Sequence, residues 1–181
     1  MTRSAETQDD LGELERVGDG ARVRFTRRLP HPRETVWRAL TDTEHVNAWF
    51  PTTIEGEWRA GEPLRFRFRD GEGPDMHGEI AVYEPPARLQ YRWGDEDLDF
   101  ALADDHGATV LTFTVTFHEI GKVARDSAGW HQCLGLLDYA VDDQPVPADA
   151  QQAWKRLFTT YTERFGEDTA TIGPPEGFDD H

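Results

Sequence analysis

Six consecutive stretches of the sequence alternate apolar and polar residues, and short turn-forming segments separate them. The stretches lie near 53–58, 64–69, 76–83, 88–93, 97–102 and 109–117. Their turns contain "RAGE", "DGEGPD", "EPPA", "GDED" and "ADDHGA". Alternation with a period of two is typical of strands that bury one face. Because connections this short join antiparallel neighbours, the pattern predicts an antiparallel meander.

One more strand is expected before the meander, and helices on both sides of it. The segment "ARVRFTRRL" (21–29) alternates. The next stretch, "ETVWRALTDTEHVNAWF" (34–50), predicts two short helices, the second opened by a capping box of Thr41 and Glu44. After the last strand, "KVARDSAGWHQCLGLLDYAV" predicts a long helix, and a further helix is expected at roughly 148–165. The buried stripe of the long helix would consist of Val123, Ser127, Trp130, Leu134, Leu137 and Val141.

Pairing the strands through their turns predicts which side chains share a face. One outer row would alternate in charge and contain Glu57, Arg65, Glu79, Arg92 and Asp99. The inner face would carry Trp58, Leu64, Ile80, Tyr91, Phe100 and Leu111 in one row, and Gly56, Phe66, Gly78, Trp93, Leu98 and Phe113 in the next. Glycine within a strand often marks a bend or a close approach. We therefore expect a strongly curved sheet whose concave face is aromatic.

The composition excludes several classes of protein. The 181 residues carry a formal net charge of −16, which would repel the phosphates of nucleic acid. No apolar run reaches the length of about 18 residues that a membrane span needs, and the N-terminus lacks the apolar core of a signal sequence. The single cysteine, Cys133, rules out an internal disulfide and a cysteine-rich metal site. We therefore expect a cytoplasmic protein without nucleic-acid or membrane partners.

The two ends of the chain are acidic and show little periodicity. Residues 1–20 and 166–181 are therefore expected to be mobile tails around a single domain at 21–165. The seven histidines show no zinc-motif spacing, and no glycine-rich phosphate loop can be singled out. No metal and no cofactor are therefore expected.

Three blocks of the sequence resemble the START-like (SRPBCC) superfamily. They are "ETVWRALTDTEHVNAWF", "HGEIAVYEPPARLQYRW" and "SAGWHQCLGLL". Within the superfamily they look like the bacterial branch named after the activator of the heat-shock chaperone ATPase, and the likeness covers about residues 21–141. The resemblance implies an α+β helix-grip fold. We expect a curved antiparallel sheet of about seven strands, two short helices after the first strand, a long C-terminal helix and an extra terminal helix.

The resemblance also implies a site between the curved sheet and the long helix, because a cavity there is common in the superfamily. A small hydrophobic or aromatic ligand would be bound by Trp49, Phe66, Gly78, Tyr91, Trp93, Phe100, Phe113, Ser127, Trp130, His131 and Leu134. Tyr91, Ser127 and His131 could supply orienting hydrogen bonds. Gly78→Leu would then intrude on the ligand without unfolding the protein. The same aromatic residues could equally be an ordinary core.

Three functions stay open at this point. The first is binding of a small hydrophobic or aromatic molecule, and the second is a cyclase-, aromatase- or hydrolase-type enzyme that uses the same cavity. The third is a chaperone-regulating or other protein-interaction domain, with a partner protein or a second copy of the chain. Two or more inward ionisable groups would favour the enzyme, and a closed aromatic core would favour the interaction domain. His131 with Asp138, two helical turns further on, could act in acid–base chemistry.

Overall fold

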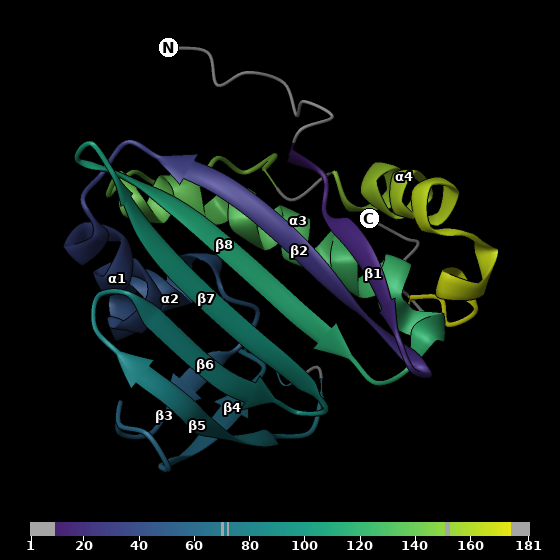
Figure 1. Cartoon of the computed structure of the whole chain (residues 1–181), viewed down its shortest axis with the longest axis horizontal. Coiled ribbons are helices and arrows are strands. Elements are labelled where there is room, and N and C mark those ends of the chain that lie inside the picture. The colour runs from purple at the N-terminus through teal and green to yellow at the C-terminus, as the bar shows by residue number, and fades with distance from the viewer. Residues whose placement is uncertain (1–9, 70, 72, 151–152, 175–181) are drawn as a thin grey trace.

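The computed structural model describes residues 10–69, 71, 73–150 and 153–174. Eight strands form one antiparallel sheet in the order β1-β2-β8-β7-β6-β5-β4-β3 (Figure 1). The strands are Glu13–Val17 (β1), Gly20–Leu29 (β2), Thr53–Glu55 (β3), Pro63–Arg67 (β4), Met76–Glu84 (β5), Arg88–Trp93 (β6), Glu96–Asp105 (β7) and Ala108–Phe117 (β8). The helices are Arg33–Thr41 (α1), Thr43–Trp49 (α2), Val123–Val141 (α3) and Trp154–Phe165 (α4), with short 3-10 turns at Ile120–Lys122 and Glu167–Ala170. No helix in the described part of the chain is long and apolar enough to cross a membrane.

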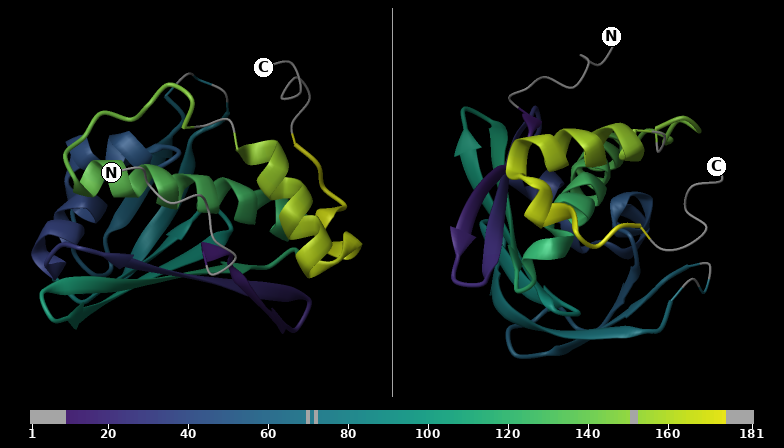
Figure 2. Two further views of the ribbon diagram at one scale, coloured as in Figure 1. Left: turned by 90° about the horizontal axis from the view of Figure 1, so that it is seen from above. Right: turned by 90° about the vertical axis from the view of Figure 1, so that its right-hand side faces the viewer.

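The sheet curves around α3, which lies along its concave face (Figure 2). The short helices α1 and α2 sit near one end of α3, and α4 sits near the other. Two short helices after the first long strand and a long helix after the last confirm the predicted helix-grip fold. The predicted stripe of α3 is also confirmed, because all six of its side chains are buried.

The two short helices are separated by a break at Asp42. α1 begins directly after Pro32, whose fixed φ suits a helix start. Asp42 ends α1 and caps α2, since its Oδ1 accepts a hydrogen bond from the backbone N–H of Glu44 at 3.1 Å. Thr41 instead donates its hydroxyl to the carbonyl oxygen of Trp37. The predicted cap at Thr41 is therefore wrong by one residue.

Strand pairing agrees with the predicted faces more closely than with the predicted partners. Tyr91 lies opposite Leu98, where Phe100 was expected. Phe100 in turn lies opposite Phe113, where Leu111 was expected. Each difference is a shift of two residues, which leaves every side chain on its own face of the sheet. The apolar residues therefore still point inward.

The outer row of alternating charges is wrong in its partners for the same reason. Arg65 does not lie opposite Glu79, and its guanidinium pairs instead with Asp75, with 2.8 Å between Nε and Oδ2. Asp99 pairs with Arg88, with 2.8 Å between Nη2 and Oδ2. All four of these paired side chains are at least 27% exposed, so each pair contributes at most about 1 kcal/mol.

The N-terminal segment, expected within a mobile tail, forms an eighth strand. β1 pairs antiparallel with β2 at the edge of the sheet. Gly12, the residue before β1, donates a hydrogen bond from its backbone N–H to the hydroxyl of Tyr161 on α4 at 2.9 Å. The same hydroxyl lies 2.8 Å from Nδ1 of His131 on α3. Tyr161 therefore joins both ends of the described chain to the long helix.

The C-terminal tail and the last helix also differ from expectation. Asp168, expected within the tail, pairs with Arg16 of β1 at 2.7 Å. The last helix begins at Trp154 and not near residue 148. The remaining parts of the expected tails, residues 1–9 and 175–181, lie outside the described residues.

Two glycines of α3 leave room for a side chain. A Cβ built on Gly129 or Gly135 meets no other heavy atom within 4 Å. Because glycine is less favourable than alanine inside a helix, we expect each Gly→Ala change to raise the free energy of unfolding by about 0.5–1 kcal/mol. Urea denaturation would measure this. Gly20→Ala is the matched control and should lower stability, since its Cβ would lie 2.0 Å from the Phe117 carbonyl oxygen. Destabilisation by Gly129→Ala or Gly135→Ala would contradict the open surroundings of that glycine.

Candidate functional site

A row of stacked rings covers the concave face of the sheet. Phe66, Tyr91, Phe100 and Phe113 come from four different strands, and successive ring centroids are 6.1, 5.9 and 4.5 Å apart. All four side chains are at most 1% exposed. β5 lies between the strands of Phe66 and Tyr91, and it presents the inward Gly78 there. Without a side chain at Gly78, the two rings meet across β5.

The sequence had suggested that Gly78 borders open space, but it does not. A Cβ built on it would lie 1.7 Å from the carbonyl oxygen of Arg92 and 3.1 Å from the ring of Phe66. A side chain would therefore force β5 and β6 apart. The interpretation of Gly78→Leu as a folded variant with weakened binding is wrong, because such a variant reports on the fold and not on the ligand.

The ring of Phe50 occupies the space that the sequence had assigned to a ligand. Phe50 follows α2 directly, and its side chain is 1% exposed. It contacts four rings, those of Trp49, Tyr91, Trp93 and Trp130, at centroid separations of 5.3, 6.3, 6.0 and 5.6 Å. Trp93 and Trp130 also meet each other at 5.1 Å. Among the described residues, the ring of Phe50 thus packs directly against both tryptophans, where room for a ligand was expected.

Hydrogen bonds hold the segment around Phe50. The guanidinium of Arg69, just beyond β4, donates to the carbonyl oxygen of Phe50 at 2.7 Å. Nε1 of Trp93 donates to the hydroxyl of Thr52 at 3.2 Å. These bonds connect the α2–β3 segment to the turn after β4 and to β6.

A carboxylic acid lies at one end of the ring array. Glu96 begins β7, is 2% exposed and pairs across the hairpin with Trp93. Nε1 of Trp130 donates to its Oε2 at 3.2 Å, and Nζ of Lys122 lies 3.4 Å from its Oε1. Burial, and after it the repulsion of the Asp126 carboxylate, raise the pKa of Glu96 well above the ordinary value of 4.5. A carboxyl group that keeps its proton can donate a hydrogen bond inside an apolar site.

The cations near Glu96 already have carboxylate partners. Nζ of Lys122 contacts the two carboxylate oxygens of Asp95 at 2.9 and 3.0 Å. Nε of Arg125 contacts Asp126 at 2.7 Å. Burial opposes the charge of Lys122, but Asp95 and the other nearby carboxylates outweigh it and raise the pKa of Lys122. Lys122 therefore lies closer to Asp95 than to Glu96, which fits the raised pKa of Glu96.

The predicted hydrogen-bonding residues have different surroundings. Tyr91 is buried in the ring array, and burial raises the pKa of its phenol. Ser127 is 0% exposed, and its hydroxyl has no hydrogen-bond partner among the described residues. His131 bonds to Tyr161 of α4, and its ring contacts Phe25 of β2. The structure thus brings Tyr91, but not His131, into contact with the predicted rings.

The remaining predicted residues lie close to the array or outside it. Trp49 contacts Phe100 and donates from Nε1 to the carbonyl oxygen of Ala39 at 2.8 Å. Leu134 is buried in the stripe of α3. Asp138 lies seven residues after His131, about 10 Å along the helix, which is too far for the suggested acid–base pair.

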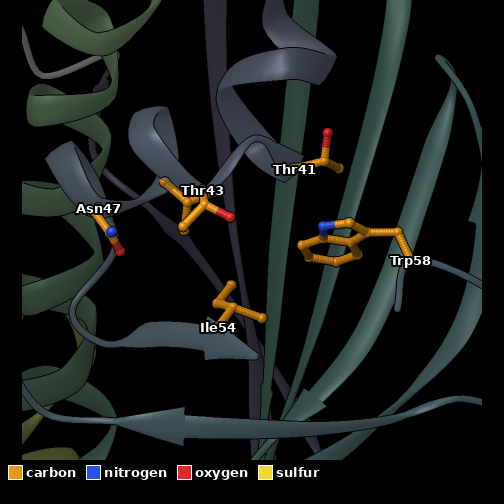
Figure 3. A pocket seen from close by; sticks show the side chains of 6 residues that line it. Thr41, Thr43, Asn47, Ile54 and Trp58 are labelled. Carbon is orange, nitrogen blue, oxygen red and sulfur yellow. The ribbon is translucent and has the colours of Figure 1, made fainter. Parts of the chain in front are cut away.

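Two hollows border the described residues away from Phe50. The first has a volume of about 10 Å³, close to the least that holds one water (Figure 3). It is lined by Thr41, Thr43, Val46, Asn47, Ile54 and Trp58. The second is an open groove of about 290 Å³ at the C-terminal end of α3. It is lined by Arg28, Leu29, Pro30, His31, Asp138, Val141 and Asp142. Neither hollow is lined by the rings of Phe50, Trp93 or Trp130.

Comparison with protein families gives a match over most of the chain. Residues 30–142 match the family described as Activator of Hsp90 ATPase homolog 1-like protein. The chain belongs to this family. The Activator of Hsp90 ATPase homolog 1-like region runs from just before α1 to the end of α3, and it contains the whole ring array. β1, β2 and α4 lie outside it.

Solved structures with this fold include proteins from several sources. The chain is similar to EF2215 from Enterococcus faecalis, a conserved protein of unknown function, with a TM-score of 0.74, 21% identity, and coverage of 85% of this chain and 90% of that one. The solution structure of CalU16 from Micromonospora echinospora gives a TM-score of 0.68 at 20% identity and covers 91% and 97% of the two chains. DynU16, a protein in the dynemicin biosynthetic locus, gives a TM-score of 0.60 at 29% identity, over 71% of this chain and 49% of that one. No curated protein matched the sequence.

Two important residues were missing from the predicted site. Phe50 was not among the predicted site residues, although its ring packs against those of Tyr91, Trp93 and Trp130. Glu96 was assigned to the turn "GDED". The alternation of Glu96, Leu98 and Phe100 along β7 was the available signal, because it places all three on the inner face.

Proposed function

We propose that this protein binds a small hydrophobic or aromatic molecule between the curved sheet and α3, in the place that Phe50 fills. One observation carries this proposal. The Phe50 ring comes from neither layer, but packs against both Trp93 and Trp130 from the connection between α2 and β3. Displacing this ring would leave the backbones of β6 and α3 in place, and a flat ligand would make the same contacts.

The contact area is large enough for useful affinity. An aromatic ring buries about 150–250 Å² in such surroundings. At about 25 cal/mol per Å² this corresponds to roughly 4–6 kcal/mol before the costs of association. The need to displace Phe50 weakens the observed affinity further, because only the fraction of molecules in which the ring has moved away can bind the ligand. Ligands with more than one ring should therefore bind more tightly than single rings.

The comparisons support a small-molecule role. The superfamily fold commonly binds hydrophobic ligands. DynU16, one of the similar structures, comes from a biosynthetic locus. Both observations favour a ligand that is a small organic compound.

Tryptophan fluorescence tests the proposal directly. We expect flat apolar molecules to quench the fluorescence saturably, because Trp93 and Trp130 would border the ligand. Trp93→Phe keeps a ring but should reduce the quenching, whereas Trp154→Phe, on α4, is the matched control and should leave it unchanged. Native mass spectrometry of freshly purified protein would detect a ligand that copurifies. If a broad panel gives no saturable quenching and no ligand copurifies, a role in contacting a partner protein takes first place.

A second candidate function is an enzyme of the cyclase, aromatase or hydrolase type. The observation that favours it is the pair of carboxyl groups, Glu96 and Asp126, beside the aromatic array. A protonated Glu96 could act as a general acid on a ligand carbonyl group. Mass spectrometry of aromatic ketones and esters incubated with the protein would test this. Conversion by the wild type that Glu96→Gln abolishes, with binding retained, would support the enzyme. Equal conversion by both would count against Glu96.

A further inference from the structure

The hydroxyl of Ser127 is an unused hydrogen-bonding group inside the protein. Ser127 is 0% exposed, and no described residue bonds to its Oγ. A serine within a helix commonly bonds back to a carbonyl of the preceding turn. An unpartnered hydroxyl in an apolar interior is unfavourable, because it gives up its hydrogen bonds to water without replacing them. The protein without ligand is therefore destabilised by this unpaired hydroxyl, and a hydrogen bond to a ligand oxygen or nitrogen would remove the destabilisation.

Ser127 lies next to a residue that borders the proposed site. It belongs to the buried stripe of α3, three residues before Trp130, so the two side chains are neighbours one helical turn apart. The ring of Trp130 contacts those of Phe50 and Phe113. A ligand that replaces Phe50 beside Trp130 would thus approach the part of α3 that carries the hydroxyl.

The charges at this end of the site disfavour an anionic ligand. The Asp126 carboxylate lies there, and the nearby cations Lys122 and Arg125 are held by carboxylates at 3.0 Å or less. Arg69, which bonds to the Phe50 carbonyl, is exposed. A ligand carboxylate drawn to Arg69 would remain at the surface, whereas a neutral group can enter without opposing charge.

We infer that the ligand presents a neutral hydrogen-bonding oxygen, a phenol hydroxyl or a ketone, to Ser127, in preference to a hydrocarbon or a carboxylate of the same size. The inference rests on the proposed function and names the chemistry of the ligand for that same site. It gives the fully buried serine a role that packing alone does not supply.

Three compounds with one ring system test the inference by isothermal titration calorimetry on the full chain. They are 2-naphthol, 2-methylnaphthalene and 2-naphthoate, which differ only in a hydroxyl, a methyl or a carboxylate group. We expect 2-naphthol to bind about 3- to 10-fold more tightly than 2-methylnaphthalene, the range for one added hydrogen bond, and 2-naphthoate to bind most weakly. Ser127→Ala should remove the preference for 2-naphthol and leave the affinity for 2-methylnaphthalene unchanged.

Gly135→Ala, at an exposed position of the same helix, is the matched control and should retain the wild-type preference. Ser127→Ala removes only the unpartnered hydroxyl, so we expect it to fold, and urea denaturation would verify this. The wild-type ratio is a test that needs no variant. Equal affinities of wild type for 2-naphthol and 2-methylnaphthalene, or a preference that persists in Ser127→Ala, would overturn the inference and leave the proposed function standing. Absence of saturable binding by all three compounds would overturn both.

Discussion

Phe50→Ala is expected to lower the free energy of unfolding by about 3–5 kcal/mol and, at the same time, to create a site for a one-ring aromatic molecule. The ring is 1% exposed and packs against Trp93 and Trp130, so its removal leaves an apolar cavity. Cavities of this kind stay dry and take up benzene. Urea denaturation with and without benzene would measure both effects. At a concentration of 100 times the dissociation constant, benzene should restore about 2.7 kcal/mol.

Phe117→Ala is the matched control for this experiment. Phe117, at the end of β8, is also 1% exposed, and its removal should destabilise the protein by a similar amount. Naphthalene, with two rings, should stabilise Phe50→Ala more than Phe117→Ala, because partly buried Trp93 borders the first cavity and gives it an open side. Equal rescue of the two variants would mean that any cavity in this core binds aromatic compounds. No rescue of Phe50→Ala would contradict the proposed location of the ligand.

Glu96→Gln is expected to flatten the dependence of stability on pH. Burial, followed by the Asp126 carboxylate, raises the pKa of Glu96 in the folded protein above the ordinary 4.5. Between these two values the folded protein holds more protons than the unfolded chain, so stability falls as pH rises, by at most about 1.4 kcal/mol per pH unit. The contribution is fully present below the unfolded pKa and is lost as pH rises through the folded pKa. Glutamine cannot ionise and should avoid this loss.

Denaturation midpoints from pH 4 to pH 9 would measure the effect. The amide oxygen that Glu96→Gln introduces can still accept the Trp130 hydrogen bond, and Lys122 keeps Asp95. We therefore expect Glu96→Gln to be more stable than wild type at the alkaline end and similar to it at the acidic end. Glu79→Gln, on the exposed outer face, is the control and should follow the wild-type curve. A difference between Glu96→Gln and wild type that stays constant with pH would contradict protonation of Glu96.

Alternation along the sequence was sufficient to predict the faces of the strands, but not their exact partners. Tyr91 could face either Leu98 or Phe100, because a shift of two residues changes the partner and keeps the face. The geometry of the β6–β7 turn selects one of these two registers, and that geometry depends on backbone angles that the sequence does not directly reveal. β1 was missed because only Leu14 of its five side chains is even partly buried, so the strand shows no alternation of apolar and polar residues.

The site was predicted in part for a similar reason. The inward rings followed from strand alternation, and the buried stripe of α3 followed from its helical period. The position of the Phe50 ring depends on where the α2–β3 segment enters the space between layers, which no periodic pattern describes. The burial of Glu96 depends on Lys122 and Trp130, 26 and 34 positions later in the chain. Tertiary contacts of this range are absent from any local pattern.

The position of β2 has a practical consequence for work on shortened chains. The family match begins at residue 30, immediately after this strand ends at Leu29. β2 pairs with β8 from Ala21 to Leu29, and the fully buried Phe25 stacks on Phe113 at 6.0 Å. A fragment cut at the family boundary would expose β8 as an open, apolar edge, the kind of edge that pairs with other molecules and aggregates. The region that matches the family, residues 30–142, therefore lacks a strand that the fold needs. A shortened chain should keep residues 20–29 to remain soluble.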